Sequence, residues 1–376
     1  MKLQTGTFSF SGRSGGETGC ALRRVLGVVS VLLVGFSASD YTRAEGEAKE
    51  AWLGLMAGPA LSSETLLAAD IASLFPQRAG LRVRPMLGDS GVDNLALLLG
   101  DTNVDIAFVS TGALAEAAAK DRGLVEKIEV VARLAPQEVH VLARPEIGGL
   151  GDLAGKSVNF GPEGSASFIA AEALFKALGI QVEVKRLDFP AAVDQLEQGA
   201  IAAAVIVGAK PSPFVSAIPI TAGLQLLPVS FGASFEAAFL PTRLEAADYP
   251  NLIRQGAQVA TLATGMALLA AKRQDDTASR RAVDGFVARL FPRFSELQGR
   301  HPRLREVNLA ATIPGFKRTP GAEAWLAAHS DPGSRSVKAT ASAGELAAVS
   351  GRPLLSKKQQ EALFRQFIEW RRDKER

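Results

Sequence analysis

The chain has 376 residues, of which 47% are hydrophobic and 22% are charged. These values are ordinary for a folded globular protein, and the length is sufficient for two domains. The net charge of +3 is small, and the basic residues are scattered except near the C-terminal end. The sequence therefore lacks the electrostatic footprint of a nucleic-acid-binding protein.

Cysteine and histidine usage narrows the chemistry further. Cys20 is the single cysteine, so the chain forms no intramolecular disulfide and no cysteine-based metal site. The histidines, His140, His301 and His329, match no metal-binding spacing. The motifs of serine hydrolases, P-loop proteins and dithiol enzymes do not occur either. We therefore expect no catalytic residue, no metal and no cofactor.

Residues 1–44 have the features of an export signal. Arg13, Arg23 and Arg24 precede an unbroken apolar run at 25–36, and small residues follow it. The run is shorter than the roughly 20 residues that span a bilayer. We expect a cleaved signal peptide and a periplasmic protein. An uncleaved N-terminal anchor is the alternative, and the choice between Sec and twin-arginine export stays open.

Residues 51–109 have the pattern of a β–α–β–α–β unit. Short apolar runs alternate with segments of helical periodicity, and small polar residues lie between them. The expected strands are 53–57, 81–86 and 104–109, and the expected helices are 64–74 and 92–99. Because consecutive β–α–β crossovers run the same way, this unit predicts a parallel sheet.

The same order of elements occurs again at residues 151–208. The expected strands are 156–160, 182–185 and 202–207, and the expected helices follow the loop 161–167 and the strand at 182–185. Gly179 and Gly199 lie at the same interval from Gly80 and Gly100, which suggests two similarly wound lobes. Similar lengths of any two β–α–β units would also explain this interval.

The connecting segments are less regular. A helix is expected at 113–120. After the segment 128–133, a strand is expected at 138–144, and it makes the first crossing between lobes. The apolar segment 224–231 is expected to cross back, and 259–271 to return through the first sheet. Further expectations are a helix at 277–290, mixed helix and turns at 291–318, turns at 326–341, and a charged amphipathic helix at 357–376.

These elements predict an α/β protein with two lobes and two mainly parallel sheets. Parallel sheets bind ligands at the carboxyl ends of their strands, so we expect a ligand cleft between the lobes. The expected organisation is a signal peptide (1–44), the first part of lobe 1 (45–144), lobe 2 (145–229), a return through the hinge that completes lobe 1 (230–329), and a C-terminal extension with the charged amphipathic helix (330–376).

A family resemblance is carried by the segments 87–95, 104–109, 153–158, 161–165 and 171–174. Together they resemble the TAXI family of solute-binding proteins of TRAP transporters. Members are exported, have a type II periplasmic-binding-protein fold and deliver small, usually carboxylate-bearing solutes to a membrane permease. The resemblance implies a receptor rather than an enzyme, with a carboxylate or amino-acid-like solute and TRAP-type permease subunits as partners.

The resemblance also implies a site, because the family's ligand loops correspond to 58–63, 90–94, 109–111 and 161–167. The implied site residues are Gly58, Ser62, Ser63, Ser90, Asn94, Ser110, Thr111, Gly164, Ser165 and Ser167. Glycine loops that lead into helices present backbone N–H groups to anions. Lys210 and Arg133 are the nearest candidates for a direct carboxylate pair, although both are equally consistent with solvated surface side chains.

The sequence departs from the family in two loops. Loop 60–64 lacks the usual tyrosine, and Ser110 and Thr111 stand where an acidic residue is common. These differences bear on the solute more than on the fold. Alternative functions are a receptor for an ABC permease, a receptor for a sensor partner contacted through the C-terminal helix, and an exported enzyme that uses the same cleft.

Overall fold

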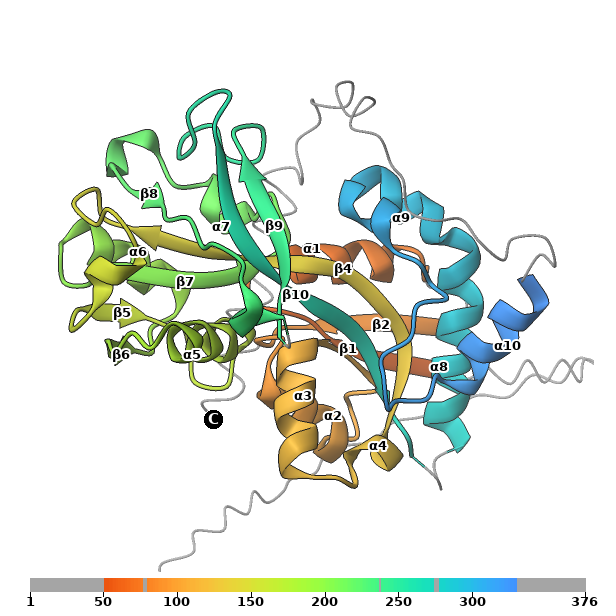
Figure 1. The fold of residues 1–376 in the computed structure, drawn as a ribbon. Helices are drawn as coiled ribbons and strands as arrows, with labels where there is room; N and C mark the ends of the chain where they lie inside the picture. The colour runs from red at the N-terminus through yellow and green to blue at the C-terminus, as the bar shows by residue number, and fades with distance from the viewer. Residues whose placement is uncertain (1–50, 77–79, 237, 274–276, 330–376) are drawn as a thin grey trace, which may run out of the picture. The chain divides into compact units, whose positions relative to one another are not determined.

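The computed structural model describes residues 51–76, 80–236, 238–273 and 277–329 (Figure 1). The expected signal peptide and the expected C-terminal extension with its amphipathic helix lie outside the described residues. None of the helices within the described ranges combines the length and the apolar character that crossing a membrane requires.

Strands and helices alternate along most of the described chain. The strands are β1 (Ala51–Met56), β2 (Leu81–Met86), β3 (Ile106–Ser110), β4 (Ile128–Ala143), β5 (Ser157–Asn159), β6 (Glu183–Lys185), β7 (Ala203–Gly208), β8 (Gln225–Leu226), β9 (Leu240–Glu245) and β10 (Gln258–Ala271). The α-helices are α1 (Ser63–Ser73), α2 (Val92–Gly100), α3 (Thr111–Lys120), α4 (Leu124–Lys127), α5 (Ala166–Leu178), α6 (Phe189–Glu197), α7 (Pro213–Ser216), α8 (Thr277–Leu290), α9 (Phe294–Arg300) and α10 (Pro320–His329).

The strands of the described residues form one ten-stranded mixed sheet. Their order is β2-β1-β3-β10-β4-β7-β5-β6, with β9 paired to β10 and β8 paired to β4. Strands β1, β2 and β3 pair in parallel, as do β5, β6 and β7. The long strands β4 and β10 run antiparallel to their neighbours and join the two parallel groups, as Figure 1 shows.

This topology confirms the predicted α/β fold with two lobes. We call β1–β3 with α1–α4 and α8–α10 the first lobe, and β5–β7 with α5–α7 the second lobe. Because β4 and β10 pair with strands of both lobes, the two parallel sheets are parts of one continuous sheet. Strands β4 and β10 lie between the two parallel groups. The loops that follow the parallel strands of each lobe therefore lie on either side of β4 and β10.

Local sequence signals start and end several of these helices. The hydroxyls of Ser62, Ser110 and Ser165 each accept a hydrogen bond from the backbone N–H three residues later, at the starts of α1, α3 and α5. The Asp188 carboxylate does the same for α6. Gly179 ends α5 in the left-handed conformation, with φ of 66°. Since capping is local, these helices lie close to their predicted positions.

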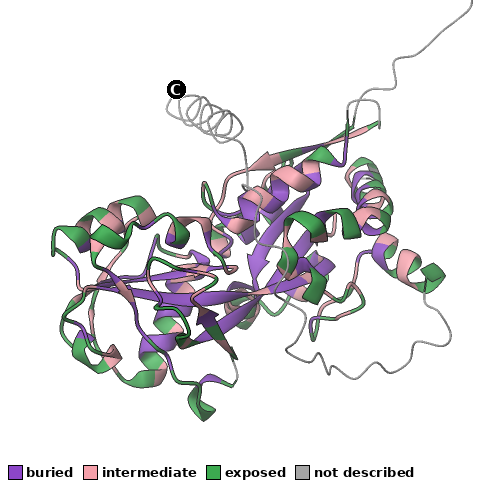
Figure 2. Cartoon of the chain, turned by 90° about the horizontal axis from the view of Figure 1, so that it is seen from above, coloured by how far each residue is buried: buried purple, intermediate pink, exposed green. Residues whose placement is uncertain are grey.

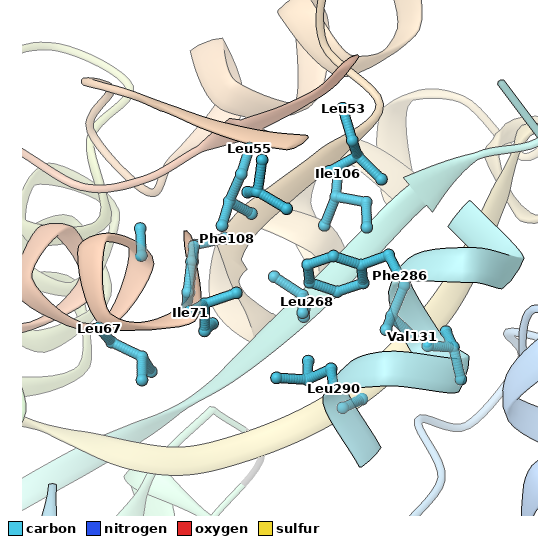
Figure 3. Packing of buried hydrophobic residues seen from close by; sticks show 14 of the residues in the cluster. Leu53, Leu55, Leu67, Ile71, Ile106, Phe108, Val131, Leu268, Phe286 and Leu290 are labelled. Atoms are coloured by element: carbon cyan, nitrogen blue, oxygen red, sulfur yellow. The ribbon is translucent and has the colours of Figure 1, made fainter. Parts of the chain in front are cut away.

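Helices cover both faces of the sheet. In the first lobe, one apolar cluster packs α1, α8 and α9 on one face, and another packs α2, α3 and α4 on the other. In the second lobe, α5 covers one face, and α6 and α7 cover the other. Figure 2 shows the buried sheet with the exposed helix surfaces outside it. Figure 3 shows the first of these clusters, in which Phe286 lies beside Ile106 and Leu268.

The strand predicted at 138–144 is part of β4, which begins earlier, at Ile128, because pairing with β10 keeps the preceding residues extended. Another strand prediction is wrong. The segment 224–231 does not cross between the lobes, since only Gln225–Leu226 is strand and pairs with the end of β4. Leu224, Leu227 and Val229 pack within the apolar clusters of the second lobe. The second crossing is β10.

Apolar residues that follow residue 229 pack against the second lobe. Phe235 and Phe239 belong to one of its apolar clusters, and Leu244 and Tyr249 belong to the other. The strand β9, which the sequence did not predict, pairs with the first half of β10 in this region. Strand β10 then pairs with β3 and so returns the chain to the first lobe.

A short helix replaces the beginning of the turns predicted at 326–341. Helix α10 starts after Thr319, whose hydroxyl accepts a hydrogen bond from Ala322 N–H at 3.3 Å. Pro320 occupies its first position, where the missing N–H costs nothing. Trp325 packs edge-on against Phe291 with ring centroids 5.3 Å apart. This tertiary contact stabilises a helix that is too short to have a clear periodicity in sequence.

Candidate functional site

The loops after β1, β2 and β3 in the first lobe meet the loops after β5 and β7 in the second lobe. Val92 N–H, at the start of α2, donates a hydrogen bond to Gly164 O at 2.9 Å. Ala166 N–H, at the start of α5, donates one to Asp89 O at 3.3 Å. The first N–H group of each helix is thus capped by a backbone carbonyl of the opposite lobe. We call this meeting of loops the inter-lobe junction.

Gly91 allows the two backbones to approach at the junction. A Cβ atom at this position would lie 1.9 Å from Gly164 O and 2.7 Å from Ser165 Cα. Both distances are far below van der Waals contact, and both involve backbone atoms that have no freedom to rotate away. The described contact between the lobes therefore requires glycine at position 91.

Several of the predicted serines hold helix ends. Ser62, Ser110 and Ser165 are buried, and each hydroxyl accepts the capping bond described above. These hydroxyls lie at the loops of the junction, and each oxygen accepts a hydrogen bond from its own helix. Their structural role is to orient the N-terminal N–H groups of α1, α3 and α5 toward the junction.

Asn94 connects the ends of two strands. Its side chain is fully buried, and its amide nitrogen donates hydrogen bonds to Ala57 O at 2.7 Å and to Phe108 O at 2.8 Å. Its amide oxygen accepts a hydrogen bond from Asp89 N–H at 3.0 Å. The amide nitrogen and oxygen of the Asn94 side chain thus both have hydrogen-bond partners. Through these bonds Asn94 connects the loops after β1 and β2 to the end of β3.

A buried carboxylate lies among the predicted residues of the first loop. Glu64 is 4% exposed, and its side chain accepts hydrogen bonds from the Ser63 hydroxyl at 2.8 Å and the Ser90 hydroxyl at 3.4 Å. A Cβ at Gly58 would lie 3.2 Å from Glu64 Cβ and 3.1 Å from Ser90 Oγ, so these residues pack closely. Ser63 Oγ also accepts a hydrogen bond from Ala209 N–H of the second lobe at 3.2 Å.

Glu64 was not among the site residues predicted from the sequence. An acidic residue in the first turn of a helix is common, because it interacts favourably with the helix dipole. From the sequence, an acid with a binding role cannot be distinguished from one that only stabilises the helix. Its burial was not visible in the sequence, since it depends on Ser90, which lies 26 positions away.

Thr111 and Ser167 lie on the borders of the junction. The Thr111 hydroxyl donates a hydrogen bond to Gly265 O in β10 at 3.3 Å. Ser167 Oγ accepts a hydrogen bond from Val207 N–H in β7 at 3.0 Å. Both hydroxyls therefore fix a helix start to a neighbouring strand.

Lys210 contributes to the junction through its backbone rather than its ammonium group. Its N–H donates a hydrogen bond to Glu138 at 3.0 Å. Its ammonium nitrogen lies 3.4 Å from a carboxylate oxygen of Asp248 and also donates to Arg243 O. The ammonium group of Lys210 therefore contacts β9 and the segment that follows it. Its pairing with a solute carboxylate stays a prediction.

The sequence also matches a known protein family. Residues 68–323 match the model of the NMT1-like family. The chain belongs to the NMT1-like family. It also resembles solved structures of substrate-binding proteins and of a protein with the periplasmic-binding-protein fold, all at low sequence identity.

Three of these structures serve as examples. An amino acid ABC transporter substrate-binding protein from Streptococcus pneumoniae, bound to L-arginine, is 15% identical over 69% of this chain and 95% of that chain, with a TM-score of 0.40. A TctC solute binding protein from Polaromonas is 17% identical over 74% and 94%, with a TM-score of 0.37. The substrate binding protein of an amino acid ABC transporter is 13% identical over 66% and 97%, with a TM-score of 0.42.

The NMT1-like protein also has a buried ion pair beside the junction. Glu138 on β4 is 0% exposed, and its carboxylate lies 2.7 Å from the Arg303 guanidinium. Its other oxygen accepts the Lys210 N–H bond. Burial raises the pKa of Glu138 to about 7, while Arg303 acts in the opposite direction. Glu138 therefore links a residue of the first lobe to a loop of the second lobe.

His140, on the same strand, is part of a buried hydrogen-bond chain. Burial lowers the pKa of His140 to about 4, so the imidazole is neutral at physiological pH. Its Nδ1 lies 3.2 Å from Ile206 O and its Nε2 lies 2.6 Å from the Tyr249 hydroxyl. Since Ile206 O only accepts, Nδ1 carries the proton and Tyr249 donates to Nε2. Tyr249 in turn accepts from Ser212 N–H at 2.8 Å.

Asp89 is a further acidic group at the junction whose charge is affected by its surroundings. Burial raises the pKa of Asp89 to about 6, and the nearby Asp93 carboxylate acts in the same direction. Gly91 N–H donates a hydrogen bond to Asp89 Oδ1 at 2.8 Å, which favours the charged form.

Within the described residues, His, Cys, Asp and Glu side chains do not gather in groups of three that could hold a metal ion.

A hollow of about 540 Å³ lies elsewhere, on the connection between β9 and β10. It is lined by residues of the single segment 245–258 and by none of the predicted site residues. Because this hollow lacks loops from two lobes and the ends of parallel strands, we place the candidate site at the inter-lobe junction instead.

Proposed function

We propose that this NMT1-like protein is an extracytoplasmic solute-binding receptor without catalytic activity. It captures a small organic anion at the inter-lobe junction and delivers it to a membrane permease. The observation that carries the proposal is the reciprocal capping of α2 and α5, in which Val92 and Ala166 donate to carbonyls of the opposite lobe. Family membership supports the same type of receptor.

The chemistry of this capping explains how an anion binds. N–H groups at helix starts combine hydrogen-bond donors with the positive end of the helix dipole. Gly164 O and Asp89 O now occupy these donors. A solute carboxylate offers two oxygens of higher charge, so it replaces the two carbonyls and bonds to both helices at once. Binding then depends on the relative position of the lobes, as expected for a receptor that signals its loaded state.

The finer assignment follows from the sequence resemblance. We propose that the protein belongs to the TAXI group, is exported to the periplasm with its signal peptide removed, and works with a TRAP-type permease. The resembling segments include both loops that meet at the junction, 87–95 and 161–165. Neighbouring genes for TRAP permease subunits support this assignment, and genes for an ABC permease and its ATPase contradict it.

A ligand screen tests the receptor function. The protein is secreted from its full-length gene, purified and heated with amino acids, mono- and dicarboxylates, keto acids and neutral controls. A solute at about 100 times its Kd adds about 2.7 kcal/mol to the free energy of unfolding, which is readily measured as a rise in Tm. Stabilisation by a carboxylate class supports the proposal. A folded protein that no member of the panel stabilises contradicts it.

Replacing Gly91 by alanine tests the junction itself. The new Cβ atom clashes with Gly164 O and Ser165 Cα, so the loops separate and the bond from Val92 N–H is lost. We expect the Val92 and Ala166 amides to exchange with solvent about tenfold faster or more in the solute-free protein. Hydrogen exchange followed by mass spectrometry or NMR measures this change.

Gly100→Ala is the matched control, because it changes a glycine at the other end of the same helix. A Cβ atom at Gly100 meets no atom within 4 Å. The control should leave exchange at Val92 and Ala166 unchanged. Equal exchange in the Gly91→Ala variant and the control would show that the lobes do not meet at this point in solution.

A further inference from the structure

Glu64 is a buried carboxylate that lacks a cationic partner in the described part of the chain. Its only hydrogen bonds there are those from the Ser63 and Ser90 hydroxyls, and none of the described lysines, arginines or histidines forms an ion pair with its carboxylate. A carboxylate offers about four acceptor positions, so two hydroxyl donors leave part of this capacity unused. The start of α1 supplies about half an elementary charge, which offsets the negative charge incompletely.

The lysine that follows the second-lobe contact to Ser63 pairs with another acid. Ala209, which precedes Lys210, donates its N–H to Ser63 Oγ, and the same hydroxyl donates to Glu64. Lys210 itself directs its ammonium group to Asp248 and Arg243 O. The Ser63 hydroxyl thus connects the Glu64 carboxylate to the second lobe. Lys210, in the same second-lobe loop, forms its ion pair with Asp248 and not with Glu64.

Other groups at the junction reinforce the need for a positive charge. Asp89 and Asp93 lie in the loop and first turn that meet Gly164. The junction therefore combines two kinds of binding group. The N–H groups of Val92 and Ala166 suit an anionic oxygen, and the Glu64 carboxylate suits a cationic N–H donor.

We propose that Glu64 binds a protonated amine of the solute, so that the solute is zwitterionic and amino-acid-like rather than a simple carboxylate. This inference rests on the proposed receptor function and specifies its substrate class. The ammonium group of the solute donates to Glu64 while its carboxylate binds at the starts of α2 and α5. Desolvation of Glu64 by closure of the lobes strengthens the ion pair and also makes a solute without a cation unfavourable, because the acid then stays unpaired.

The test uses pairs of compounds that differ in the amine alone. L-Glutamate is compared with 2-oxoglutarate, L-alanine with pyruvate, and L-phenylalanine with phenylpyruvate, by thermal shift and then by calorimetry. We expect stabilisation by at least one amino acid and about 10- to 100-fold weaker binding of its keto acid. Equal or tighter binding of the keto acid overturns the role of Glu64 and leaves the receptor function intact. No binding by either member of any pair overturns both.

Variants locate the effect at Glu64. Glu64→Gln removes the charge and should weaken binding of the amino acid by about 10- to 100-fold while changing keto-acid binding little. Glu64→Asp keeps the charge and should retain part of the affinity. Glu296→Gln is the control, because it removes an exposed acid from the first turn of α9. Unchanged amino-acid affinity in a folded Glu64→Gln variant overturns the proposal, and the wild-type comparison decides it if that variant does not fold.

Discussion

Replacing Phe286 by alanine is expected to lower the free energy of unfolding by about 3–5 kcal/mol. Phe286 is 0% exposed and stacks on Phe75 with ring centroids 5.3 Å apart and planes 6° from parallel. Figure 3 shows it between helix α8 and the strands of the first lobe. Its removal leaves a cavity that surrounding side chains on rigid strands fill only in part.

Thermal and urea unfolding measure this effect. At about 2–4 °C per kcal/mol, the Tm should fall by roughly 10 °C. Ile220→Ala is the control, because Ile220 is 70% exposed and its truncation should change stability by less than about 0.5 kcal/mol. A loss below about 1 kcal/mol for Phe286→Ala would contradict the packing described for this cluster.

The second large effect is expected when Arg303 is replaced by methionine. The substitution leaves Glu138 fully buried without its guanidinium partner, and breaking such a pair typically costs about 3–5 kcal/mol. Methionine retains much of the apolar stem of arginine, so the loss reports the charge rather than the volume. The cost should be larger at about pH 8 than at about pH 5, because protonation removes the unpaired charge.

The sign of this pH dependence follows from the pKa of Glu138. Its folded-state pKa is raised from 4.5 to about 7. An acid with a raised pKa holds its proton more strongly when folded, so its contribution to stability falls as pH rises from 4.5 to about 7. Loss of Arg303 raises the pKa further and extends the fall to higher pH.

His140 acts in the opposite direction. Its pKa is lowered from 6.5 to about 4, so its contribution is present above 6.5 and is lost as pH falls toward 4. Since both proteins retain His140, this contribution cancels when the Arg303→Met variant is compared with the wild type at each pH. The measured difference then reports Glu138.

Arg305→Met is the matched control for this experiment. Arg305 lies in the same short 3-10 helix, Pro302–Glu306, and is exposed. Its replacement should change stability by less than about 0.5 kcal/mol at either pH. A difference between Arg303→Met and the wild type that is small, or equal at about pH 5 and about pH 8, would show that Glu138 does not depend on Arg303.

The candidate site could be predicted only in part from the sequence. The loops after β1, β2, β3 and β5 were identified by their glycines and serines, and the structure brings them together. The hydroxyls of Ser62, Ser110 and Ser165 are helix caps. A serine before a helix has the same local pattern whether it binds an N–H group of its own helix or a ligand. Glu64 was overlooked for a similar reason, since an acid in a first helical turn has a sufficient local explanation.

The sequence by itself determined the elements whose causes are local. Caps such as Ser165, the left-handed end at Gly179 and the alternation of apolar residues act over a few positions, so they predicted most helices and strands of both lobes. Only the tertiary structure decided which strand crosses the hinge and which acids are buried. Strand β10 pairs with β4 across more than 100 positions, and Glu138 meets Arg303 across 165. Burial and charge pairing depend on such distant contacts, and no local pattern records them.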